Sequence, residues 1–453
     1  MTSNLVRLFV FAWTAMSLIA ADFRIPMERY KLKNGLRVVL SRDNTTPVVA
    51  VYVIYGVGAR SEERGRTGFA HLFEHMMFQG SKNAPKGTHF KMVESSGGSM
   101  NGSTHPDYTD YFEVLPSNKL AVALWLESDR MRSLAITQEN LANQKEAVKQ
   151  ERRLGMDNRP YNTAIVDRWP EIAFRNWGNS HSLIGSFEDL NAAGVSDVAR
   201  FFKTYYAPNN AALVVVGDIR PDEAKKLIEE SFADIEPQPQ PKGPDLTEPE
   251  RKEERHDVYK DSLAQVPMVV IGYPGPARRS PDFYALGMLD LVLTGGDSSR
   301  FQQHLVKGKQ SVLDYEVNLG WPFGDPSDYR DPNVYGMFLV HNPAFTGDQV
   351  VDQVAAELKD VQDNGVTQKE LERARTFLRA SHIRGLQTTF NRARLLGVYE
   401  MFDGDANLIN SDLENYMKVT REQVRDVAQR YLQTERRAVL EIVPAPAQEE
   451  KPE

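Results

Sequence analysis

His71, Glu74 and His75 lie in one short stretch, His71-Leu72-Phe73-Glu74-His75, and their types and spacing suit metal-assisted hydrolysis. On a helix that turns about 100° per residue they share one side, and histidines four apart can aim both rings at one ion. Glu74 is then placed to hold and deprotonate a metal-bound water. The other side is an apolar, core-facing stripe of Phe69, Leu72, Phe73, Met76 and Met77. The alternative is a solvated helix face with two spare histidines.

A catalytic zinc site commonly has three protein ligands, so the third must come from another element. A second helix is predicted from Thr137, and one of its faces consists of Leu141, Gln144, Val148 and Glu151. If this face points to the core, Glu151 is the carboxylate that is carried inward. The spacing leaves open the alternative that Glu151 forms a surface salt bridge with Arg152 or Arg153.

The composition limits what else the chain can do. It has 453 residues, 41% hydrophobic and 26% charged, which is typical of a globular protein and, by length, of two large domains or three smaller ones. There is no cysteine, so any metal must be held by His, Asp or Glu. The net charge of -8 gives no electrostatic case for a nucleic-acid partner. Three further histidines, His89, His105 and His181, are interpreted as surface or loop residues.

The N-terminal 21 residues differ from the rest of the chain. Arg7 is followed by an apolar run to Ile19 and then by Ala20-Ala21, a pattern that predicts a secretory signal peptide at 1–21. An uncleaved N-terminal anchor is the alternative. We expect the mature protein to be exported and periplasmic, either soluble or peripherally associated with the membrane.

The chain reads as two similar halves. A Pro-rich, charged linker at 236–255 separates domains predicted at 22–235 and 256–445, and a tail follows at 446–453. Each half opens with two β-branched runs, a turn and a helix, the helices starting near Thr67 and Pro281. We interpret this as a duplication, with chance similarity of apolar runs as the alternative. Aligning the halves places Leu286, Leu289 and Asp290 at the positions of His71, Glu74 and His75, so one chain has one metal site.

Further motifs resemble those of the pitrilysin-type metallopeptidases, the inverzincins of family M16, over nearly the whole mature chain. They include Gly97-Gly98-Ser99-Met100-Asn101-Gly102-Ser103-Thr104, Asn158-Arg159-Pro160-Tyr161, Ile184-Gly185-Ser186 and Tyr206-Ala207-Pro208-Asn209-Asn210. The resemblance implies that His71, His75 and Glu151 bind one Zn²⁺ per chain and that Glu74 is the catalytic base. The length is similar to that of short subunits such as the mitochondrial processing peptidase and bacterial paired peptidases.

The resemblance also implies a fold and a way of binding substrate. The fold class is α+β, the LuxS/MPP-like metallohydrolase type, with two duplicated domains that each have a mostly antiparallel sheet packed by helices and together form a half-shell. Peptide substrates in the family add as a strand to an exposed sheet edge near the metal. The matching edge here is Ser99 to Thr104, with Ser99, Asn101 and Gly102 as substrate-binding residues. The alternative is that Gly97-Gly98 forms a turn that Asn101 caps.

Two departures from the family pattern concern the site. Many relatives carry a second glutamate one heptad before the third ligand, where this chain has Gln144, so we expect Gln144 to support the ligands without binding metal. The family also uses an Arg and a Tyr from a C-terminal domain to stabilise the oxyanion. In relatives that supply the pair it lies in a segment resembling Lys-Gly-Tyr-x-Tyr-Gly, which is absent here. Arg300 and Tyr315 are the candidates in the corresponding stretch. We therefore expect a metal-free homologous subunit to supply the pair in a heterodimer, with a homodimer as the alternative.

The expected function is that of a zinc-dependent endopeptidase acting on unfolded peptides or short protein segments, as the catalytic subunit of a two-subunit assembly. Two alternatives come from other functional classes. One is a non-catalytic assembly subunit of the same fold, and the other is a peptide-binding carrier. Both require a silent metal site, whereas His71, Glu74, His75 and Glu151 are all present.

Overall fold

The structure, a computed structural model, describes residues 24–320 and 329–445. The predicted signal peptide and C-terminal tail lie outside these residues. The first sheet has six strands in the order β1-β2-β6-β3-β5-β4. Its strands are β1 (Glu28–Lys31), β2 (Arg37–Arg42), β3 (Val48–Tyr55), β4 (Ser99–Thr104), β5 (Thr109–Pro116) and β6 (Ala211–Gly217). Long β-branched runs such as β3, which is buried along nearly all its length, explain why these segments form central strands.

The second sheet repeats the first without its β1. Its order is β7-β11-β8-β10-β9, and the one parallel pair, β7 with β11, corresponds to the parallel pair β2 with β6. The strands are β7 (Arg255–Asp261), β8 (Met268–Pro274), β9 (Val312–Gly320), β10 (Val334–His341) and β11 (Ala438–Pro444). The shared order confirms the predicted fold class, with two duplicated, mostly antiparallel sheets.

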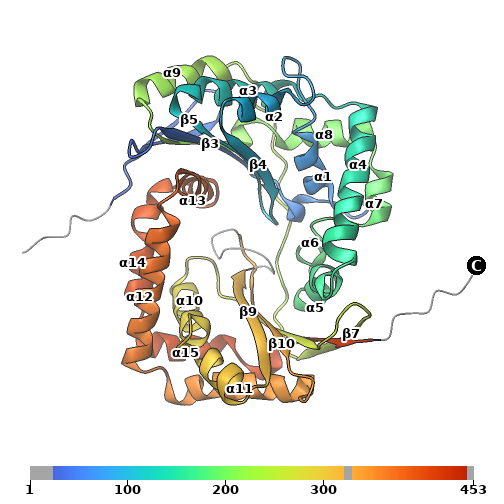
Figure 1. Ribbon diagram of the computed structural model, residues 1–453, viewed down its shortest axis with the longest axis vertical. Helices are drawn as coiled ribbons and strands as arrows, with labels where there is room; N and C mark the ends of the chain where they lie inside the picture. The colour runs from blue at the N-terminus through green and yellow to red at the C-terminus, as the bar shows by residue number, and fades with distance from the viewer. Residues whose placement is uncertain (1–23, 321–328, 446–453) are drawn as a thin grey trace, which may run out of the picture.

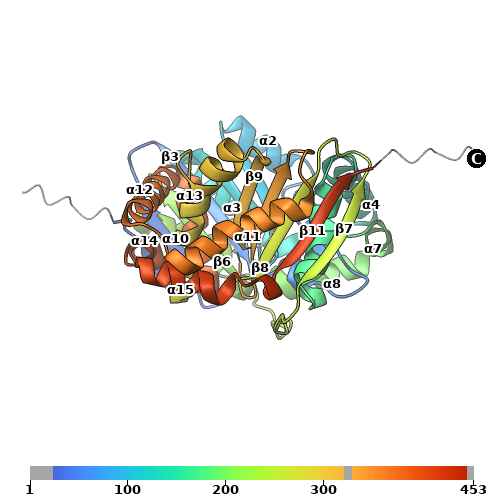
Figure 2. The same ribbon diagram turned by 90° about the horizontal axis from the view of Figure 1, so that it is seen from below.

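Helices cover both sheets (Figures 1 and 2). In the first half they are α1 (Phe69–Met76), α2 (Thr88–Ser95), α3 (Leu120–Ser133), α4 (Gln138–Arg152), α5 (Trp169–Ala173), α6 (Trp177–Ser180), α7 (Phe187–Ala192), α8 (Val195–Tyr205) and α9 (Pro221–Phe232). In the second half they are α10 (Pro281–Thr294), α11 (Gly347–Asn364), α12 (Gln368–Gly385), α13 (Thr389–Phe402), α14 (Asp412–Met417) and α15 (Arg421–Tyr431). Figure 2 shows α11 lying across the second sheet. No helix within the described ranges is long and apolar enough to cross a membrane.

Each half lends one helix to the sheet of the other half. Helix α13 packs on β3 and β6, where Gly397 lies so close to Tyr52 that a Cβ would come within 2.6 Å of its ring. In the same way α5 packs on the second sheet, where Gly272 allows the ring of Trp169 to approach within 2.5 Å of a built Cβ. These contacts form two apolar cores that cross between the halves. The two halves are therefore interlocked.

Candidate metal centre

Helix α1 has the apolar face that the sequence predicts. Phe69, Leu72, Phe73, Met76 and Met77 are all buried in the core of the first half. The helix is shorter than predicted, because it begins after Gly68 and ends at Met76. Gly68 has a φ of 78°, and a Cβ there would lie 2.5 Å from the carbonyl oxygen of Ile184. The start of the helix therefore depends on a close backbone crossing that only glycine permits.

The structure brings His71, His75 and Glu151 together. Glu151 Oε2 lies 3.2 Å from His75 Nε2, and Glu151 Oε1 lies 3.7 Å from His71 Nε2. The three candidate ligand atoms all lie within 4.8 Å of one another. His71 is buried, whereas the Glu151 side chain is 49% exposed, so the cluster is open on one side. Two imidazoles and one carboxylate around an open position fit a catalytic Zn²⁺.

The electrostatics of this cluster suit a cation. Burial lowers the pKa of His71 to about 4, which leaves its ring neutral and able to act as a ligand. Burial also acts to lower the pKa of His75, but the hydrogen bond with Glu151 and the charge of Glu74 outweigh it and raise that pKa. The hydrogen bond from His75 in turn lowers the pKa of Glu151. The direct contact of His75 Nε2 with Glu151 Oε2 thus lies where a metal ion would bind between the two side chains.

The structure does not show the alternative surface salt bridge of Glu151 with Arg152 or Arg153. Arg152 donates to the carbonyl of Gly185 and pairs with Asp167, and Arg153 donates to Gln150. The side chain of Gln144 lies beside His75 and acts to raise its pKa. Gln144 thus contacts one candidate ligand, and its supporting role stays a prediction.

Glu74 lies against the edge of the first sheet. Its carboxylate is buried, and Thr104 Oγ1, at the end of β4, donates a 2.6 Å hydrogen bond to Glu74 Oε2. Burial raises the pKa of Glu74 to about 7, while the Thr104 hydrogen bond acts to lower it. A carboxylate with a pKa near neutrality can both accept and release a proton. Thr104 was predicted only as the end of the exposed sheet edge, and its contact with Glu74 was not predicted, because that contact joins two elements.

β4 is an edge strand, as predicted. Within the part of the chain that the structure describes it pairs only with β5, and Ser99 and Asn101 are exposed. Gly97 does form a turn, with a φ of 77°, but Asn101 lies within the strand and does not cap that turn. At Gly102 a Cβ would approach the ring of Tyr111 to 2.9 Å. The strand closest to Glu74 thus has a free hydrogen-bonding edge.

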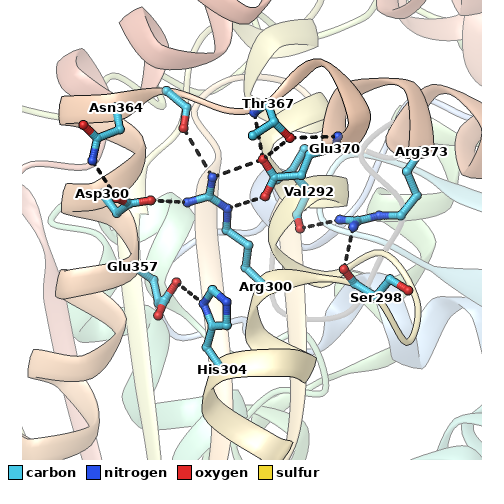
Figure 3. Close-up of polar contacts among 11 residues, drawn as sticks. Val292, Ser298, Arg300, His304, Glu357, Asp360, Asn364, Thr367, Glu370 and Arg373 are labelled. Carbon is cyan, nitrogen blue, oxygen red and sulfur yellow. Dashed lines mark hydrogen bonds and ion pairs between the residues drawn. The ribbon is translucent and has the colours of Figure 1, made fainter. Parts of the chain in front are cut away.

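Arg300 and Tyr315 lie elsewhere, within the second half. Figure 3 shows Arg300 among its polar partners. Arg300 Nε and Nη1 lie 2.7 Å from Glu370 and Asp360 respectively, at the junction of α11 and α12. The hydroxyl of Tyr315 lies 3.2 Å from that of Ser299. Both side chains brace the second half, and the structure does not bring them to the His71–His75–Glu151 cluster.

Of the three further histidines, His105 and His181 lie in loops, as expected, whereas the side chains of His89 and His181 are buried and not on the surface. His89 is buried and its Nε2 lies 2.8 Å from Glu113, in a cluster with Glu127. Arg130 pairs with Glu127 in that cluster, and its positive charge disfavours a second metal ion there. The side chain of His181 is only 5% exposed and contacts Glu62.

Comparisons with known proteins all find similarity to peptidases. Residues 37–186 match the sequence profile described as Insulinase (Peptidase family M16), and residues 194–378 match the one described as Peptidase M16 inactive domain. Zinc protease PqqE of Helicobacter pylori is 29% identical over 387 residues, 84% of this chain and 85% of that protein. The probable mitochondrial-processing peptidase subunit beta of Schizosaccharomyces pombe is 22% identical over 379 residues, 82% of this chain and 81% of that protein.

Solved structures show the same fold. A protease from Helicobacter pylori superposes with a TM-score of 0.86 at 26% identity, over 93% of this chain and all of that one. The periplasmic protease PqqL from Escherichia coli has a TM-score of 0.75 at 17% identity, over 94% of this chain and 48% of that one. The match to the profile named as inactive begins within the first half, at residue 194, and includes Leu286, Leu289 and Asp290, which align with the three residues of the metal helix.

Proposed function

Because the chain belongs to peptidase family M16, we propose that it is a zinc-dependent endopeptidase that hydrolyses unfolded peptides or short protein segments. The observation that carries this proposal is the convergence of His71, His75 and Glu151 beside the buried carboxylate of Glu74. Relatives named zinc proteases support the metal and the reaction class.

Each residue has one task in this proposal. His71, His75 and Glu151 hold Zn²⁺, one per chain, and the ion supplies positive charge that polarises the scissile carbonyl and acidifies water. Glu74 removes a proton from the attacking water and passes it to the leaving amine. The hydroxyl of Thr104 fixes the carboxylate of Glu74 in the orientation that this transfer needs.

The substrate binds along β4. Its unpaired edge offers backbone groups to an extended peptide, and Thr104 at the end of the same strand touches Glu74. Ser99, Asn101 and Gly102 lie on this strand and contact the peptide, which must be unfolded locally to add as a strand. This requirement favours flexible segments over folded proteins.

The active assembly contains a second subunit. Arg300 and Tyr315 are held in the second half, so a metal-free homologous subunit supplies the oxyanion-stabilising pair in a heterodimer. Two comparisons support a paired arrangement. One relative is named as a processing peptidase subunit beta, and this chain matches 48% of the length of PqqL. A homodimer is the alternative.

The protein is exported to the periplasm in this proposal, after cleavage of residues 1–21. The apolar run and the small residues at its end support export. Mass spectrometry of the mature N-terminus tests it, and a retained Met1 on exported protein would refute cleavage.

The test of function is hydrolysis of an unfolded peptide by this chain alone and after mixing with homologous metal-free subunits. Activity only in the mixture, with one zinc per chain, supports both the metal centre and the heterodimer. Activity from the chain alone supports the peptidase function and refutes the proposal that a metal-free homologous subunit supplies the oxyanion-stabilising Arg and Tyr. Zinc bound without hydrolysis in either case favours the non-catalytic subunit or the peptide-binding carrier.

A further inference from the structure

Glu62 caps the helix that carries the metal site. Its carboxylate accepts hydrogen bonds from the backbone N–H of Gly68, at 3.0 Å, and of Ala70, at 2.8 Å. Gly68 is the N-terminal cap of α1 and has no side chain to offer, so a carboxylate from a preceding turn takes this role. A negative charge at a helix N-terminus is also electrostatically favourable. Ala70 directly precedes His71, so Glu62 fixes the end of the helix that carries the first metal ligand.

His181 holds Glu62 from the other side. Its Nε2 lies 3.1 Å from Glu62 Oε2 and 2.9 Å from the carbonyl oxygen of Ala59, and its Nδ1 lies 3.0 Å from the carbonyl oxygen of Trp177. A carbonyl oxygen can only accept a hydrogen bond, and a neutral imidazole has a single N–H. In the neutral ring one nitrogen lone pair would therefore face a carbonyl oxygen. Only the imidazolium, with an N–H on each side, satisfies these contacts.

The surroundings also favour the charged ring. Burial acts to lower the pKa of His181, but the hydrogen bond and charge of Glu62 and the two carbonyls outweigh it and raise that pKa. The ring stacks on Trp177 at 4.2 Å between centroids. The other charged side chains on the segments around His181 have partners of their own or are exposed. Arg60 pairs with Asp107, Arg66 pairs with Asp197, and Arg64 lies over the Trp177 ring. Asp189 accepts from Thr67, Glu248 accepts from Asn179, and Glu63 is exposed.

We propose that His181 is a positioning residue of the metal centre, which as an imidazolium holds Glu62 against the N-terminus of α1 and thereby fixes His71. The activity readout of this inference rests on the proposed peptidase function, whereas its protonation readout does not. Loss of the ring proton leaves one carbonyl facing a lone pair and removes the counter-charge of Glu62. The start of α1 then gains freedom, so zinc affinity and kcat fall while KM is unaffected, because β4 is not part of this contact.

The first test is the protonation state. The ring nitrogens of ¹⁵N-histidine-labelled protein are followed by NMR against pH, and His181→Gln assigns the signal. We expect both nitrogens of His181 to be protonated at pH 7, with a midpoint above the ordinary value of about 6.5. A neutral ring at pH 7 overturns the inference.

The second test compares two glutamine variants. His181→Gln lowers kcat and zinc affinity about tenfold at unchanged KM, and it removes the alkaline loss of kcat that follows titration of His181. The control is His256→Gln, which removes another imidazole–carboxylate pair, with Glu441 at 2.7 Å, at the edge of the second sheet. Equal behaviour of the two variants overturns the inference. If the wild-type protein neither binds zinc nor cleaves peptides, the proposed function fails and the NMR titration alone decides on His181, as it also does if His181→Gln does not fold.

Discussion

Glu74 and Thr104 meet where the metal helix α1 faces the edge strand β4, and the chemistry of the centre is divided between them. The carboxylate of Glu74 is buried and its pKa is raised to about 7, so it can accept a proton from water. The hydroxyl donates to one carboxylate oxygen and leaves the other available. A base that is held in one orientation does not have to be reoriented during the reaction.

The role of Glu74 as the proton acceptor predicts the effect of Glu74→Gln. The amide retains the shape of the side chain but cannot accept the proton, so turnover falls by about a hundredfold or more. Zinc content stays at one per chain, because the three ligands are unchanged. Glu139→Gln, an exposed position on α4, is the matched control. Normal turnover in Glu74→Gln would refute the assignment.

The contact with Thr104 predicts a difference between two substitutions at that position. Thr104→Val preserves the shape but removes the donor, and we expect kcat to fall about tenfold, the usual worth of a hydrogen bond to a charged group. Thr104→Ser keeps the hydroxyl and should retain most of the activity. Steady-state kinetics on one peptide measure both variants. Equal losses in the two would show that the hydroxyl is not what matters.

The sequence predicted the residues whose spacing places them on the inward face of their own helix, but not the contacts that other segments make with them. His71, Glu74 and His75 have a spacing that is meaningful by itself, and the helical wheel singled out Glu151. Thr104, Glu62 and His181 contact the site helix or its cap only after distant segments pack together. No local periodicity indicates such contacts, which is why His181 was interpreted only as a surface or loop residue.

Helix α10 shows what the same element becomes without metal. Its Asp290 occupies the position that aligns with His75, is half-buried, and accepts a 3.0 Å hydrogen bond from Tyr335 Oη. Leu286 and Leu289, in place of His71 and Glu74, are part of the apolar core. Helix α10 thus has apolar core residues at two of the positions that hold site residues in α1, and Asp290 is the acidic residue at the third.

Asp290 makes stability depend on pH. Burial raises its pKa from 3.8 to about 7, so the folded state keeps a proton that the unfolded state loses. The stability from this group is complete below about pH 4 and is lost as the pH rises through 7, on the order of 4 kcal/mol in total. Asp290→Asn cannot ionise, so its free energy of unfolding rises relative to wild type between pH 5 and 8. Urea unfolding measures this.

The control for Asp290→Asn is the same substitution at Asp222, a fully exposed position on α9. Its free energy of unfolding should follow that of the wild type at every pH. If Asp290→Asn also runs parallel to the wild type, Asp290 is ionised in the folded protein and the proposed burial cost is wrong.

Most elements follow from periodicity and end signals. Helix α4 begins after Thr137, whose side chain accepts from Asn140, and α10 begins at Pro281, both where predicted. The start of α1 differs because the Thr67 hydroxyl donates to Asp189 on α7 and so does not cap its own helix. That contact joins segments 122 residues apart, which a local pattern cannot contain.

The whole molecule is held together by an exchange of helices. Helix α13 of the second half covers the first sheet, and α5 of the first half covers the second sheet (Figure 1). In the first half α5 follows β5, α3 and α4, and in the second half α13 follows β10, α11 and α12 in the same order. The exchange is therefore itself part of the duplication. A half on its own would expose the apolar face that its partner helix covers.

This arrangement predicts that neither half folds alone. Residues 22–235 and 256–445, expressed separately, should aggregate or remain unfolded, whereas co-expression should give a stable complex. Size-exclusion chromatography and circular dichroism of the three samples measure this. A monomeric 22–235 fragment that unfolds cooperatively would contradict the interlocking described above.

The duplication could be predicted from the sequence, but the exchange of helices could not. The similar openings of the two halves and the Pro-rich segment between them indicated two related units. Which sheet α5 and α13 cover depends on Gly272 and Gly397, whose close approaches to Trp169 and Tyr52 exist only in the folded chain. Both sheets have apolar faces, so composition does not distinguish one target from the other.

The most direct test of the central proposal is removal and return of zinc. The rate of hydrolysis of an unfolded peptide is measured on the assembled protein as purified, after chelation, and after titration with Zn²⁺. We expect activity to vanish on chelation and to return in proportion to zinc, saturating at one ion per chain, while Glu151→Gln fails to regain it. Hydrolysis that persists after complete removal of metal would contradict the metal centre of His71, His75 and Glu151.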